Sequence, residues 1–155
     1  IYRDVRFSKD KTPYKTNMSA AISSGGKTMG VPGYYFQIEP GGKSFVAAGL
    51  YIPEPETLGK IRQEIDYNGD RLDKILKAPA FRKFYGTLWN GDVLKTVPKG
   101  YAKDHPHIEF LKLKSFLVEH PFTDDEVTGS SFKKTLVTSM RAAQPLIEFL
   151  KEGLD

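Results

Sequence analysis

The chain contains no cysteine among its 155 residues. This absence excludes disulfide bonds, thiolate metal ligands and a cysteine nucleophile. Long apolar runs are also missing, since the longest, Phe45 to Ile52, falls far short of the roughly 20 residues that cross a bilayer as a helix. No signal-peptide pattern opens the chain, so we expect a cytoplasmic protein with no membrane partner.

What the sequence does contain is enough apolar material for a folded core. Hydrophobic residues make up 39% of the chain and aromatic residues 12%, which argues against disorder. The length predicts a single domain over 1–155. An alternating pattern, typical of a strand, begins directly at Ile1, so we expect this domain to be a fragment of a somewhat longer natural protein.

Hydrophobic periodicity predicts an α+β fold, with a small, mainly antiparallel sheet and helices packed mostly on one face. We expect strands at 1–7, 34–39, 45–52 and 116–119, and a short strand around Met18–Ile22 would fit the long connection at 8–33. Helices are expected from Pro55, from an N-cap at Asp70, and over 131–152, where Pro145 should split the last one. Thr123 and Glu126 have the spacing of a capping box.

Positive charge is concentrated near the start of the chain. Residues 1–50 hold seven basic and three acidic residues, whereas residues 51–155 hold sixteen of each, so the net charge of +4 belongs to the first third. Arginine can present a planar fork to phosphate or carboxylate, and lysines on a loop add positive potential. The sequence therefore predicts a site for an anionic ligand, with the following candidate residues: Arg3, Arg6, Lys9, Lys11, Tyr14 and Lys15.

Other motifs are incomplete. Gly25-Gly26-Lys27-Thr28 resembles the end of a phosphate-binding loop, but Ala21 stands where that motif needs its first glycine. Asp66-Tyr67-Asn68-Gly69-Asp70 resembles the start of a calcium loop, yet Lys77 occupies the place of the bidentate glutamate. The histidines, His105, His107 and His120, match no standard zinc spacing. We therefore expect neither a metal site nor a cofactor.

The run from Arg3 to Lys15 (RDVRFSKDKTPYK) resembles the domain of unknown function 2461 family of uncharacterised bacterial and fungal proteins. Further matches follow at Gly33–Tyr35, Ile38–Pro40, Gly49–Pro53, Pro98–Tyr101 and Asp104–Pro106. The resemblance covers essentially the whole chain and implies that a helical segment precedes Ile1 in relatives. It implies no activity, but its first motif coincides with the basic segment.

Three functions remain open from the residues. The first is a binding module for an anionic ligand, such as a nucleotide, a phosphorylated metabolite or, with weaker support, nucleic acid, since no nucleic-acid motif is present. The second is an enzyme acting on such a ligand, with Asp10, Asp104 or His105 as acid or base. It requires these residues to meet the basic segment in one cleft. The third is a protein-interaction or structural domain, in which the basic residues form a solvated face.

Overall fold

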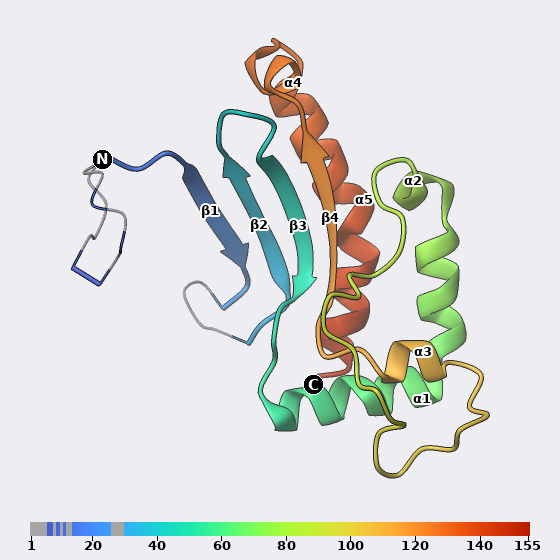
Figure 1. Ribbon diagram of the computed structural model, residues 1–155. Coiled ribbons are helices and arrows are strands. Elements are labelled where there is room, and N and C mark those ends of the chain that lie inside the picture. The colour runs from blue at the N-terminus through green and yellow to red at the C-terminus, as the bar shows by residue number, and fades with distance from the viewer. Residues whose placement is uncertain (1–5, 8, 10, 12–13, 26–29) are drawn as a thin grey trace.

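A computed structural model describes residues 6–7, 9, 11, 14–25 and 30–155 of the chain. Four strands and five helices lie within these residues, and Figure 1 shows their arrangement. In chain order the elements are β1 (Met18–Ser23), β2 (Gly33–Ile38), β3 (Ser44–Leu50), α1 (Pro55–Lys77), α2 (Pro79–Arg82), α3 (Ile108–Leu111), β4 (Phe116–Phe122), α4 (Asp124–Thr128) and α5 (Phe132–Glu152).

The strands form one antiparallel sheet in the order β1-β2-β3-β4. Because side chains alternate along a strand, the pairing register decides which residues share a face. Ala21, Tyr35, Ala47 and Glu119 stand in one row across the sheet, and Ser23, Gly33, Gly49 and Leu117 stand in the next such row. We call the face that carries these two rows the open face.

The opposite face carries the hydrophobic core. Along β3 the side chains of Ser44, Val46, Ala48 and Leu50 are buried, whereas the residues between them are only partly buried. The helix α5 lies against this face, and α1 packs against α5 (Figure 1). Helices therefore cover mainly one face of an antiparallel sheet, and the predicted fold class is confirmed.

Local interactions fix the turn between β2 and β3 and the start of α4. The Ser44 hydroxyl donates to the Glu39 carbonyl (3.0 Å) and accepts from the Glu39 N–H (2.9 Å), which closes the turn between β2 and β3. Gly41 and Gly42 sit in that turn with φ of 87° and 70°, a left-handed conformation that favours glycine. The predicted capping box is also present, since Thr123 and Glu126 each accept a backbone N–H of the other.

The predictions for the two long helices had different outcomes. Residues 55–77 comprise two helical stretches that meet at a kink at Asn68 (φ −126°), so a second helix is present as predicted, although Asp70 lies within it and is not its N-cap. The predicted split of the last helix was wrong. Pro145 does not split α5, which runs unbroken from Phe132 to Glu152. The reason is packing, because Ala143, Leu146 and Ile147 on either side of the proline are buried in the core. At Pro145 the local breaking signal is outweighed by these tertiary contacts.

The strand expected at 1–7 lies mostly outside the described residues. Arg6 and Phe7, its two described members, are exposed and belong to no strand. Instead, the edge of the sheet is the strand β1, which matches the short strand expected around Met18–Ile22. Within the part of the chain that the structure describes, no helix is long and apolar enough to cross a membrane.

Candidate ligand-binding site

The basic segment lies before β1, at one side of the sheet (Figure 1). Lys9, Lys11, Tyr14 and Lys15 are exposed there, and the Arg6 guanidinium lies 5.9 Å from the centre of the Phe7 ring. Arg3 and Asp10, also predicted as site residues, lie outside the described residues. The side chains of the described lysines in this segment are therefore accessible to solvent.

The predicted acid–base residues Asp104 and His105 lie elsewhere. They precede α3, beside α1, on the other side of the molecule from the basic segment (Figure 1). The His105 Nε2 bonds the Asp66 carboxylate at 2.9 Å, and its Nδ1 accepts the His107 N–H at 3.1 Å. Asp104 is exposed. The structure does not bring these residues together with the described cations.

A second histidine–carboxylate pair lies next to the first. His107 Nε2 is 3.1 Å from the Asp70 carboxylate, one helical turn after Asp66 in α1. The His107 ring lies almost directly on the backbone of Gly69, where a Cβ atom would come within 2.2 Å of the ring. These contacts fix the loop before α3 on the bend of α1, which is a structural role for both histidines.

His120 does not join this group. It lies in β4, its Nδ1 is 2.9 Å from the Phe84 carbonyl, and its ring packs edge-on against Phe84 and Phe122. Within the described ranges, no group of three or more His, Asp or Glu side chains is arranged to hold a metal ion.

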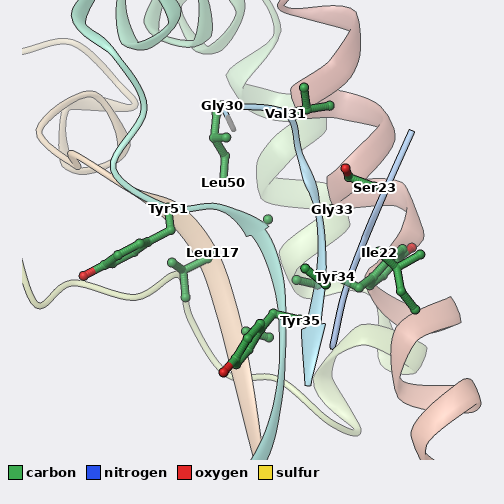
Figure 2. A pocket seen from close by; sticks show the side chains of 14 residues that line it. Ile22, Ser23, Gly30, Val31, Gly33, Tyr34, Tyr35, Leu50, Tyr51 and Leu117 are labelled. Atoms are coloured by element: carbon green, nitrogen blue, oxygen red, sulfur yellow. The ribbon is translucent and has the colours of Figure 1, made fainter. Parts of the chain in front are cut away.

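A depression in the described surface lies at the end of the sheet where β1 and β3 finish. It has a volume of about 530 Å³, and Figure 2 shows the residues around it. Tyr35, Tyr51 and Leu117 project on its open side, whereas Tyr34 points away toward α5. We call this depression the hollow; its lining is Ala21, Ile22, Ser23, Gly30, Val31, Gly33, Tyr34, Tyr35, Ala47, Ala48, Gly49, Leu50, Tyr51 and Leu117.

Small residues make the floor of the hollow. Gly33, Ala47 and Gly49 occupy neighbouring positions on the open face, and Ala21 lies on the far side of Tyr35 in the same row as Ala47. Gly49 has φ +136°, and a Cβ atom at this position would come within 2.1 Å of the Phe116 carbonyl oxygen. A larger residue at Gly49 would therefore push β3 away from β4.

Two tyrosines border these small residues: Tyr35 stands between Ala21 and Ala47, and Tyr51 follows the end of β3. Tyr51 is 63% exposed and meets Trp89 edge-on, with ring centres 6.0 Å apart. Tyr35 packs against Phe45 at 5.6 Å, and its hydroxyl donates to the Gln37 side chain at 2.9 Å. Small residues beside the partly buried ring of Tyr35 and the exposed ring of Tyr51 suit a planar, largely apolar ligand group.

The backbone beside Tyr51 is held in an unusual conformation. Ile52 has φ +42°, which is rare for a β-branched residue, and it is 63% exposed. Its N–H donates to the Ser115 hydroxyl at 2.9 Å, a contact between the end of β3 and the start of β4. Strain of this kind clusters at functional sites, where the surrounding structure fixes it.

Sequence reasoning missed the hollow. Its floor residues are separated by up to about thirty positions in the chain, and only the pairing register places them side by side. The small residues Ala47 and Gly49 stand out in the sequence between Val46, Ala48 and Leu50, but this pattern indicated only a strand at 45–52. The run of small residues on one face was the available signal.

Comparison with known proteins adds a family. The family model described as "Conserved hypothetical protein (DUF2461)" matches residues 1–149, nearly the whole chain, and confirms the resemblance noted from the motifs. Neither a curated protein nor a solved structure matches the chain.

Proposed function

Because the chain belongs to the DUF2461 family of conserved hypothetical proteins, whose description gives no activity, we propose its function from the site: it is a binding domain for a small anionic ligand with a flat ring. The ring would lie in the hollow. The observation that carries this proposal is the group of small residues on the open face, beside the partly buried ring of Tyr35 and the exposed ring of Tyr51.

The charge of the ligand is inferred from the basic segment. Lys9, Lys11 and Lys15 are exposed on the chain that enters β1 at Met18, whereas the hollow lies at the Ser23 end of this strand, so the lysines would act on the ligand through long-range attraction. Their positive potential would attract an anion and raise its local concentration near the open face. A nucleoside monophosphate has both required parts, a planar base and a phosphate, and it is the probe we choose.

The enzyme alternative has less support. Its acid–base candidate His105 has both ring nitrogens within bonding distance of partners, Asp66 and the His107 N–H, so neither nitrogen is open to a substrate in this arrangement. General acid–base catalysis needs such a group within hydrogen-bond reach of the reacting atom. The geometry favours binding without chemistry.

Isothermal titration with three probes tests the proposal. We expect adenosine monophosphate to bind more tightly than adenosine, which lacks the charge, and than inorganic phosphate, which lacks the ring. Added salt should weaken the binding of the nucleotide, because screening acts on the lysines. Absence of nucleotide binding, or equal affinity for nucleotide and phosphate, would overturn the proposal.

Two matched sets of variants locate the ligand. Ala21→Trp should fill the hollow and abolish binding, whereas Ser19→Trp, on the same strand and the same face but outside the lining, should leave it unchanged. Replacing Lys9, Lys11 and Lys15 by Glu should weaken binding. The same change at the exposed lysines Lys103, Lys133 and Lys134 should not. Wild-type affinity of Ala21→Trp for adenosine monophosphate would show that the ligand does not bind in the hollow.

A further inference from the structure

The two edges of the sheet differ in whether another described segment is hydrogen-bonded to them. Along β4, the N–H of Trp89 donates to the Leu117 carbonyl at 2.8 Å, so the segment after α2 covers part of this edge. The strand β1 at the other edge pairs with β2 on one side, and no described strand pairs with its outer side. An edge of this kind presents backbone N–H and C=O groups to any strand that can align with it.

The side chains of β1 include neither a charge nor a proline, the two residue features that most often protect an edge strand against such pairing. Its sequence, MSAAIS, is exposed along almost its whole length. Met18 and Ile22 are 54% and 52% exposed, although both are large and apolar. Together with Ala20 between them, they form a row on the face opposite the open face.

The apolar residues on this face of β1, Met18, Ala20 and Ile22, are complementary to a second copy of themselves that runs in the opposite direction. In an antiparallel pair, residues directly opposite one another lie on the same face of the sheet. If two copies of β1 align about Ala20, Met18 of each copy stands opposite Ile22 of the other and Ala20 stands opposite Ala20. We propose that two copies of the chain associate through β1 in this register and form one continuous eight-stranded sheet around a two-fold axis.

Charge placement is compatible with a second copy as the occupant. In the proposed register, Lys15 of one copy lies beyond the Ser23 end of the other. The two Lys15 side chains are therefore about ten strand positions, or roughly 30 Å, apart. That separation far exceeds the screening length of about 8 Å at physiological ionic strength, so the two basic segments do not oppose association. A partner strand that carried a similar basic segment and ran parallel to β1 would instead place the like charges of the two segments side by side.

The absence of cysteine allows a direct test by cross-linking. Opposed residues of an antiparallel pair have Cα atoms about 4.5–5.5 Å apart, which suits a disulfide bond. Under mild oxidation, Ala20→Cys should give a covalent dimer. Ala21→Cys, the matched control on the next residue, should not, because Ala21 would stand opposite Ser19. Cross-linking of Ala21→Cys in preference to Ala20→Cys, or of neither, would overturn the proposed register.

Sedimentation of the unmodified chain gives an independent test. We expect twice the chain mass at high micromolar concentration, and a single-chain mass after Met18→Lys and Ile22→Lys together, because four lysines would then meet at the joint. Tyr67→Lys, which changes another exposed apolar residue (71% exposed) on α1, should leave the dimer intact. A wild-type chain that stays monomeric, or a dimer that survives the double change, would overturn the proposal.

Discussion

At the scale of single residues, Ile52 is the clearest departure from ordinary backbone geometry. A φ of +42° brings the Cβ atom of an L-residue close to its own carbonyl oxygen, at a free-energy cost of roughly 1–2 kcal/mol. The exposed isoleucine side chain buries little surface in return. The conformation persists because the Ile52 N–H is held by Ser115 and because the chain must turn from β3 toward α1.

Replacing Ile52 by asparagine should therefore stabilise the protein. Asparagine adopts the left-handed conformation far more readily, so we expect the free energy of unfolding to rise by about 1 kcal/mol. Urea denaturation followed by circular dichroism measures the change. Ile22→Asn is the control, because Ile22 is similarly exposed but lies in an extended strand; it should give no gain. A loss of stability in Ile52→Asn would contradict the strain argument.

At the scale of elements, two glycines of α1 should respond in opposite ways to alanine. Gly59 is exposed, and nothing lies within 4 Å of a Cβ atom built there, so Gly59→Ala should raise the free energy of unfolding by about 0.5–1 kcal/mol. At Gly69 the same methyl group meets the His107 ring, and we expect a loss of about 1–3 kcal/mol. Thermal or urea unfolding of the two variants gives the comparison.

The contact between Gly69 and His107 has its own control. If the clash causes the loss, Gly69→Ala should lower the free energy of unfolding less in a His107→Ala background than in the wild type. The same loss of stability from Gly69→Ala in both backgrounds would show that the His107 ring does not cause the loss, and that α1 and the loop before α3 adjust independently.

A second element-scale contact joins the β2–β3 turn to α4. The Asp124 carboxylate accepts the N–H groups of Gly42 (3.0 Å) and Gly41 (2.9 Å), and these bonds hold the pKa of Asp124 below its usual range. A carboxyl group with a lowered pKa in the folded state stabilises the protein above its ordinary pKa, near 4, and loses this effect as the pH falls.

Asp124→Asn should thus be less stable than the wild type at neutral pH, and the difference should shrink as the pH falls below about 4. Urea titrations at several pH values measure it. Asp125→Asn, in the same first turn of α4, has the same effect on helix charge but no bond to the turn among those described. It should show a smaller difference, and equal behaviour of the two variants would argue against the contact.

The elements that sequence patterns predicted well are those specified locally. The strands β2 and β3, on either side of Pro40-Gly41-Gly42, match those expected at 34–39 and 45–52, and the capping box of α4 follows from the spacing of Thr123 and Glu126. Pro145 misled because its local effect is outweighed by buried neighbours along α5. The hollow could not be predicted, since Ala21 and Gly49 become neighbours of Tyr35 only through strand pairing.

At the scale of the whole molecule, Tyr85 joins the layers of the fold. It follows α2, its ring packs against Phe81 and against His120 of β4, and its hydroxyl donates to the Ser139 carbonyl of α5 at 3.0 Å. The side chain is almost completely buried. Burial raises the pKa of Tyr85 to about 12, because the phenolate would lose its hydration in the core.

The raised pKa predicts alkaline loss of stability. A group whose pKa is higher in the folded state stabilises the protein below its unfolded pKa, near 10, and this contribution is lost as the pH rises through 12. Two pKa units correspond to about 2–3 kcal/mol, so the free energy of unfolding should fall by that amount between pH 10 and pH 12. Burial also raises the pKa of Tyr34 and Tyr101, which adds to the same trend.

Tyr85→Phe separates the central tyrosine from the others. Without the hydroxyl, the bond to Ser139 is lost, and we expect about 1 kcal/mol less stability at neutral pH. Because phenylalanine does not titrate, the decline between pH 10 and pH 12 should be shallower than in the wild type, so the two stability curves should converge or cross. Tyr67→Phe, at an exposed position of α1, should leave the wild-type curve unchanged. Parallel curves for Tyr85→Phe and the wild type would show that the alkaline transition does not depend on this buried hydroxyl.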